Sequence, residues 1–92
     1  MQYEIEKNRI TLLDDNGKYC GDLTFIKKGL KVIDINHTYV PDEYRGQGYA
    51  ALLLAKAVEY AKEKNKKIIP SCPYARRAFE KNEEYQELEY HG

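Results

Sequence analysis

The fold of this chain is decided by the stretch His37-Thr-Tyr-Val-Pro-Asp-Glu-Tyr-Arg-Gly-Gln-Gly-Tyr-Ala50. It has the pattern of a strand end, a turn, a glycine-containing loop and a helix start. Gly46 and Gly48 let the backbone approach a ligand closely, and the first N–H groups of a helix have no partner within it. With the positive end of the helix dipole behind them, these donors favour an anion such as phosphate. The stretch therefore predicts an anion-binding loop or, more simply, a glycine-rich turn that only starts a helix.

The residues after this loop carry the clearest helix pattern in the chain. Residues 49–67 are rich in alanine and leucine, lack glycine and proline, and repeat apolar side chains at helical spacing. Asn65 and the lysines around it suit the C-terminal end of that helix. Residues 67–70 then predict a short strand, and residues 73–81 a final helix with proline in its first turn. The polar residues 83–92 show no clear pattern.

Before the loop, the pattern is that of four short strands joined by turns. Asn16-Gly17 is the strongest short signal for a hairpin, and glycine follows Lys28 at the next turn. The chain is therefore expected to be α+β, of the α/β/α type, with a mostly antiparallel mixed sheet in the order ββββ-α-β-α. The four expected strands are residues 2–7, 9–14, 18–28 and 30–40.

Length and composition exclude several classes of function. The chain has 92 residues without a repeat or linker, so one domain over residues 1–92 is expected. Its 15 basic and 15 acidic residues cancel, which argues against nucleic-acid and anionic-membrane partners. Without a signal peptide or membrane span, a cytoplasmic protein is expected, with Cys20 and Cys72 as free thiols and no metal site. Cys20 lies opposite in strand phase to Leu23 and Phe25 and is interpreted as structural.

Three kinds of phosphate-binding loop compete for the glycine-containing segment. A Walker A loop requires lysine after its last glycine, where this chain has Tyr49, so that loop is excluded. Residues 46–51 fit the dinucleotide spacing GxGxxA, but the preceding strands are connected by hairpins and no acid ends the strand at 68–70. The pattern RxxGxA of residues 45–50, placed between an antiparallel strand and a helix, closely resembles the acetyl-coenzyme A (acetyl-CoA) loop of the GNAT N-acetyltransferase superfamily.

This resemblance extends over roughly residues 20–80. In detail the chain is similar to a very small GNAT-like subfamily with HTxVP before the loop, here residues 37–41, and CPY after the next strand, here residues 72–74. Tyr39 stands where that subfamily implies an acidic residue. Residues 7–9 leave no room for the two helices that shape the acceptor pocket in full-length members, so these helices are expected to be missing.

The resemblance also implies which residues hold acetyl-CoA. Backbone N–H groups from Gly46 to Ala50 would bind the pyrophosphate, and Arg45 would support the loop. The pantetheine arm would lie along the strand ending at Tyr39-Val40, where two neighbouring parallel strands, residues 32–40 and 67–70, splay apart. The implied cofactor-binding residues are Tyr39, Val40, Arg45, Gly46, Gln47, Gly48, Tyr49 and Ala50.

Three side chains near the expected thioester are candidate catalytic residues. Cys72, before the last helix, is either a nucleophile that carries the acetyl group or a small buried residue. His37 is expected to share a strand face with Ile33 and Ile35, and is either a general base or a structural histidine. Tyr74 is either the acid that protonates the departing coenzyme A thiolate, as in many members of the superfamily, or an ordinary aromatic.

Three functions follow from these patterns. The first is an N-acetyltransferase that moves an acetyl group from acetyl-CoA to an unidentified amine, directly or through Cys72. The second is a non-catalytic sensor or docking module that only binds acetyl-CoA or coenzyme A. The third is an interaction domain without a cofactor, which requires the glycine loop to be only a helix start.

Overall fold

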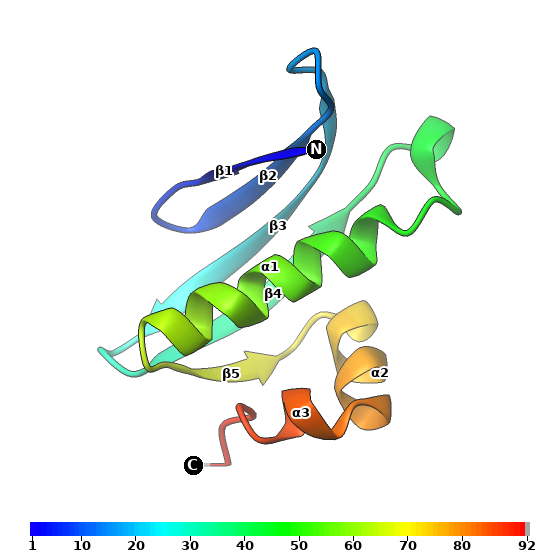
Figure 1. The fold of residues 1–92 in the computed structure, drawn as a ribbon. Coiled ribbons are helices and arrows are strands. Elements are labelled where there is room, and N and C mark those ends of the chain that lie inside the picture. The colour runs from blue at the N-terminus through cyan, green and yellow to red at the C-terminus, as the bar shows by residue number, and fades with distance from the viewer. Residues whose placement is uncertain (92) are drawn as a thin grey trace.

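The computed structural model of the protein describes residues 1–91, which form a five-stranded mixed sheet and three α-helices (Figure 1). The strands are β1 (Gln2–Ile5), β2 (Arg9–Leu13), β3 (Tyr19–Lys28), β4 (Val32–Tyr39) and β5 (Lys67–Pro70). The helices are the 3-10 turn η1 (Asp42–Tyr44), α1 (Tyr49–Glu63), α2 (Pro73–Lys81) and α3 (Glu83–Gln86). Among the described residues, no helix is long and apolar enough to cross a membrane.

The strands lie side by side in chain order, which confirms the expected α+β fold. β1 to β4 form an antiparallel meander, whereas β5 pairs parallel to β4 after the α1 crossover. The helix ends at Glu63, close to the C-terminal end that the sequence predicts around Asn65. Asn65 then takes the left-handed backbone conformation, with a φ of 55°, and the chain turns into β5.

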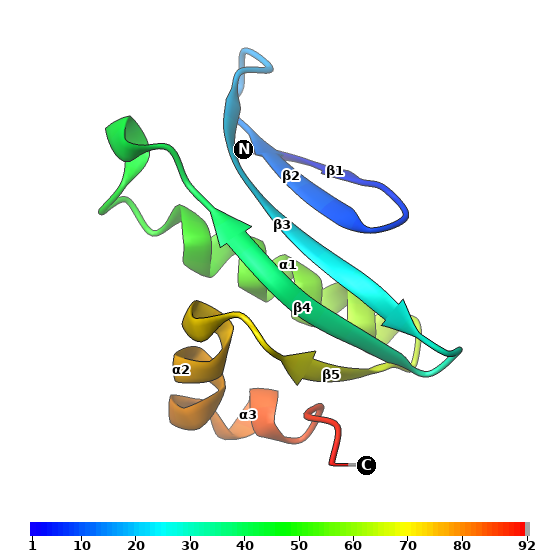
Figure 2. The same cartoon turned by 180° about the vertical axis from the view of Figure 1, so that it is seen from behind.

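The core lies between α1 and one face of the sheet. α1 presents one apolar stripe to the strands, as its spacing predicts, and covers that face (Figure 1). In the opposite view, β3 and β4 cross in front of α1, and no helix of residues 1–91 lies over the near face of these strands (Figure 2). The buried α1 residues are Leu53, Leu54, Ala57, Val58 and Ala61, and the buried strand residues include Ile10, Leu12, Leu23, Phe25, Ile33, Ile35 and Ile68.

The C-terminal residues, which show no clear sequence pattern, form α3 and then return along the free edge of β5. The N–H of Ile68 donates to the carbonyl of Leu88 at 2.8 Å, and the N–H of Tyr90 donates to the carbonyl of Ile68 at 2.8 Å. Arg76 of α2 forms an ion pair with Glu89 at 2.9 Å. The tail thereby joins the outer edge of β5 to α2.

β4 and β5 separate before β4 ends. Their last paired residues are Ile35 and Pro70, and the N–H of Cys72 donates to the carbonyl of Ile35 at 2.9 Å. β4 continues to Tyr39 paired only with β3, while the chain after β5 turns away into α2. The two parallel strands therefore diverge at the position that the resemblance implied.

A β-bulge at Asn36 changes which side chains of β4 face α1. Phe25 of β3 pairs with Ile35, but Thr24 pairs with His37, so Asn36 is the extra residue. His37 consequently lies exposed on the open face of the sheet, away from α1. The expectation that His37 shares a face with Ile35 is wrong, because simple alternation does not hold across a bulge.

Gly21 allows the end of β4 to pass close to β3. Its φ of 152° is unfavourable for other residues, and a Cβ atom there would lie 2.7 Å from the backbone oxygen of Tyr39. We expect Gly21→Ala to lower the free energy of unfolding by about 2 kcal/mol, measured by urea denaturation. Gly29→Ala is the matched control, because Gly29 also has a positive φ, 74°, but nothing within 4 Å of the added Cβ. Equal losses for the two variants would contradict the close approach.

Candidate functional site

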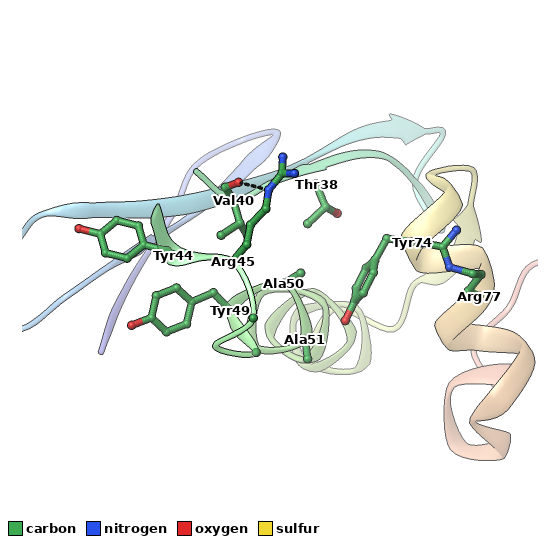
Figure 3. Close-up of a pocket in the computed structure, with 11 residues that line it drawn as sticks. Thr38, Val40, Tyr44, Arg45, Tyr49, Ala50, Ala51, Tyr74 and Arg77 are labelled. Atoms are coloured by element: carbon green, nitrogen blue, oxygen red, sulfur yellow. Dashed lines mark hydrogen bonds between the residues drawn. The ribbon is translucent and has the colours of Figure 1, made fainter. Parts of the chain in front are cut away.

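A cleft of about 480 Å³ opens where the end of β4, the first turn of α1 and the start of α2 meet (Figure 3). Backbone forms one wall, at the glycine loop, and the Tyr74 ring extends from α2 toward α1 on the other side. The lining residues are Thr38, Val40, Tyr44, Arg45, Gly46, Gly48, Tyr49, Ala50, Ala51, Tyr74 and Arg77.

The glycine loop presents a run of free backbone donors to this cleft. Gly46 and Gly48 have φ angles of 84° and 81°, a conformation that other residues adopt only with strain, although a Cβ atom at either would meet nothing. Gly48 is the N-cap of α1 and offers no side chain to its first turn. Within residues 1–91, no N–H from Gly46 through Ala51 has a hydrogen-bond acceptor. Such convergent donors at a helix N-terminus suit an anion.

Arg45 ties this loop to the end of β4. Its Nε donates to the carbonyl of Val40 at 3.2 Å and lies 3.2 Å from a carboxylate oxygen of Asp42. Both charged side chains are largely exposed, so the ion pair adds little stability. The hydrogen bond to Val40 instead fixes where the loop leaves β4.

Tyr74 and Arg77 form the α2 wall of the cleft. They lie three residues apart and therefore share one face of the helix. Partial burial raises the pKa of Tyr74 above its usual value, and the positive charge of Arg77 offsets only part of this shift. At neutral pH, Tyr74 is thus a protonated phenol that can donate a hydrogen bond or a proton.

Cys72 lies directly behind the cleft wall. The residue is 5% exposed, and its thiol donates to the hydroxyl of Thr38 at 3.7 Å. Thr38 lines the cleft and Cys72 does not. The bulge at Asn36 causes this arrangement, since it turns Thr38 to the side of β4 that faces α1.

The cleft gathers most of the residues that the sequence singled out. Those that line it are Val40, Arg45, Gly46, Gly48, Tyr49, Ala50 and Tyr74, whereas Gln47 and Cys72 do not, and His37 and Tyr39 are exposed on strand β4 outside it. Sequence reasoning missed Thr38, Tyr44, Ala51 and Arg77. The spacing from Tyr74 could have identified Arg77, because residues three apart on a helix are neighbours. No carboxylate or imidazole is among the lining residues.

The sequence model of the GCN5-related N-acetyl-transferases matches residues 2–88. The chain belongs to this family. Protein NATD1 of chicken is 36% identical over 62 residues, which cover 67% of this chain and 56% of the relative. The human protein NATD1 is 36% identical over 61 residues, which cover 66% of this chain and 54% of the relative. The chain thus spans a little over half the length of these relatives.

Solved structures show the same fold in other family members. A GCN5-like protein of Staphylococcus aureus, solved by NMR, is 35% identical to this chain and has a TM-score of 0.76. The match covers 97% of this chain and 87% of the Staphylococcus aureus chain. The Escherichia coli GNAT family protein YhbS was solved in complex with CoA and is 23% identical. Its match covers 65% of this chain and 37% of that protein, with a TM-score of 0.58, which is a likeness of fold.

Proposed function

We propose that residues 1–92 form one minimal domain that binds acetyl-CoA in the cleft and transfers its acetyl group to an amine. The observation that carries this proposal is the run of unpaired backbone N–H groups from Gly46 through Ala51. A pyrophosphate supplies many acceptor oxygens and negative charge, which these donors and the helix dipole complement. Family membership supports the same ligand, because members of this family are named for acetyl transfer.

The rest of the cleft also suits this substrate. The divergence of β4 and β5 after Ile35 leaves one side of β4 without a paired strand, where a pantetheine amide could take up strand-like hydrogen bonds. Thr38 and Tyr74 stand at this inner end of the cleft, and the glycine loop stands at the other. The thioester would then lie near the phenol of Tyr74.

The chemistry we propose needs few groups from the protein. The amine nitrogen attacks the carbonyl carbon of the thioester, the C–N bond forms, the C–S bond breaks, and the amine loses a proton to solvent. The departing thiolate takes a proton from Tyr74, whose pKa is raised further above the neutral range by burial, and the resulting phenolate regains a proton from solvent. His37, on the open face, is not placed to act inside the cleft.

Cys72 offers a second route to the same product. Its sulfur could first accept the acetyl group, releasing coenzyme A, and then pass that group to the amine. The hydrogen bond to Thr38 places the thiol beside the cleft, while its burial requires Thr38 to move before the sulfur can attack. Single-turnover kinetics and intact mass separate the routes: an acetyl group on wild type but not on Cys72→Ala indicates two steps, and unchanged turnover of Cys72→Ala indicates direct transfer.

A non-catalytic acetyl-CoA-binding module is the second candidate function. The observation that favours it is the lack of a carboxylate or imidazole among the lining residues, which leaves no evident base in the cleft. A panel of peptides, polyamines and small amines distinguishes the two functions. Acetylation of any acceptor above the uncatalysed rate supports the enzyme, and saturable binding without turnover across the panel supports the module.

A thermal-shift titration with acetyl-CoA, coenzyme A and NADH tests the shared part of both candidates. At one hundred times its dissociation constant, a ligand stabilises the native state by about 2.7 kcal/mol. We expect both coenzyme A forms to raise Tm and NADH to leave it unchanged. No shift with either coenzyme A form would mean that the loop from Gly46 to Ala51 is only a helix start, and both candidates would fail.

A further inference from the structure

Asp34 is an acid on the open face of the sheet, the face away from α1, and within residues 1–91 no cation pairs with it. Its Oδ1 atom is the one buried side-chain nitrogen or oxygen of these residues that has no hydrogen-bond partner. In the sheet register, Asp34 lies between Ile26 of β3 and Ile69 of β5, so apolar side chains flank it on both sides. A buried polar atom without a partner is costly, and a charged one more so. We therefore expect this carboxylate to gain a cation from outside the chain.

The surface around Asp34 carries the complementary charge as well. Val32 lies two residues before Asp34 on the same face of β4, and Lys28 of β3 is its register partner. Lys28 is exposed, and within residues 1–91 it forms no ion pair. With Ile26, which is 47% exposed, these residues form four corners that we call the Asp34 patch. One diagonal of the patch joins the apolar Ile26 and Val32, and the other joins two opposite charges.

We infer that the Asp34 patch is the interface of a homodimer in which Asp34 of each copy pairs with Lys28 of the other. A twofold axis along the apolar diagonal sets Ile26 and Val32 each against its own counterpart. The same axis sets each Asp34 against the partner's Lys28, so both ion pairs form at once. The two sheets then cross at a steep angle, which is one of the two ways in which sheets pack face to face. This inference is independent of the proposed function.

The rest of the molecule leaves room for this arrangement. No helix of residues 1–91 lies over the near face of β3 and β4 in Figure 2, and the cleft lies on the other side of the sheet, beside α1. Five strands about 4.8 Å apart, with about six residues each, outline roughly 500 Å². A standard stable interface uses about 800 Å² per copy. The expected dimer is therefore weak, with a dissociation constant on the order of 10–100 µM.

Sedimentation equilibrium of the full chain, from about 5 to 500 µM, tests this interface. We expect the mass of wild type to rise with concentration from the 10.8 kDa of one chain toward twice that value. Lys28→Asp and Asp34→Lys should each raise the dissociation constant at least about tenfold, because each sets like charges opposite one another. The variant that combines both substitutions restores opposite charges and should dimerise within about threefold of wild type.

Lys27→Asp is the matched control. It makes the same charge change one residue earlier in β3, where the side chain points to the other face of the sheet, and should dimerise like wild type. Far-UV circular dichroism establishes that each variant is folded. Because Lys28 is exposed, Lys28→Asp still tests the interface if Asp34→Lys does not fold.

Three results would overturn the dimer or its ion pair. A wild type that keeps the mass of one chain at about 500 µM would exclude the dimer. A dimer that Lys28→Asp leaves as tight as in wild type, or that Lys27→Asp weakens equally, would exclude the pairing of Lys28 with the partner's Asp34. A folded double variant that stays monomeric would exclude the same pairing. Binding of acetyl-CoA should be alike in all these variants, since none of the substituted residues lines the cleft.

Discussion

Replacing Ala51 with glutamate is expected to weaken acetyl-CoA binding by about 30- to 100-fold while leaving the fold intact. Ala51 is exposed, lines the cleft and stands in the first turn of α1. A carboxylate there would lie beside the unpaired N–H groups of the first helix turn and would repel the pyrophosphate. With two unit charges about 5 Å apart at an effective dielectric constant of about 20, the repulsion is about 3 kcal/mol before screening.

Ala51→Glu should be as stable as wild type or slightly more stable, although it binds acetyl-CoA more weakly. A negative charge in the first turn of a helix is stabilising by about 0.3–1 kcal/mol, which offsets the slightly lower helix propensity of glutamate. A Tm close to that of wild type, together with lost binding, would separate an electrostatic effect from unfolding. Raising the salt concentration should recover part of the affinity, since screening weakens the repulsion.

Two control variants make the Ala51 experiment specific. The side chain introduced by Ala51→Gln is nearly as large as that of Ala51→Glu but carries no charge. This variant should bind acetyl-CoA within about threefold of wild type. Ala55→Glu puts the same charge one turn further along α1, at an exposed residue that does not line the cleft, and should bind normally. If Ala51→Glu binds as tightly as wild type, the donors of this helix turn do not hold the pyrophosphate.

The sequence was sufficient to predict the order of the elements and the position of the loop. Asn16-Gly17 predicted the hairpin, and the alanine-rich run predicted α1, because both signals are local in the chain. The resemblance implied the parallel pairing of β4 with β5, which the structure contains. The return of residues 88–90 along β5 could not be predicted, since it depends on backbone hydrogen bonds with no sequence pattern.

Two β-bulges break the side-chain alternation on which the sequence interpretation relied, and the second of them misplaced a candidate site residue. Alternation counted from Leu23 puts Cys20 on the open face, but the irregularity between Leu12 and Leu13 leaves it 1% exposed in the core. Counting from Ile35 in the same way puts His37 on the face that packs against α1 and Thr38 on the open face, which is the reverse of the observed arrangement. A bulge shifts the side-chain period by one residue and leaves no signature in a single sequence, so the lining of the cleft was only partly predictable.

Replacing Tyr74 with phenylalanine is expected to lower kcat by about 100-fold with little change in KM for acetyl-CoA. The ring stays, so its packing against the core is kept, and within residues 1–91 the side-chain hydrogen bonds of α2 and its start involve Cys72 and Arg76 but not the phenol. What is lost is the proton for the thiolate, a need that arises only as the C–S bond breaks. An effect on kcat without an effect on binding is the mark of such a group.

The pH dependence of turnover gives Tyr74 a second, independent test. Because burial raises its pKa above the usual value of 10.0, the phenol stays protonated through the neutral range, and turnover that depends on it should fall only above about pH 10. Tyr74→Phe should lose this alkaline limb, whereas Tyr85→Phe should keep it, since Tyr85 packs on Phe79 and does not line the cleft. If turnover depended on an essential base instead, it would fall toward acid pH rather than toward alkaline pH. A kcat within twofold of wild type in Tyr74→Phe would mean that the thiolate leaves without protonation by the protein.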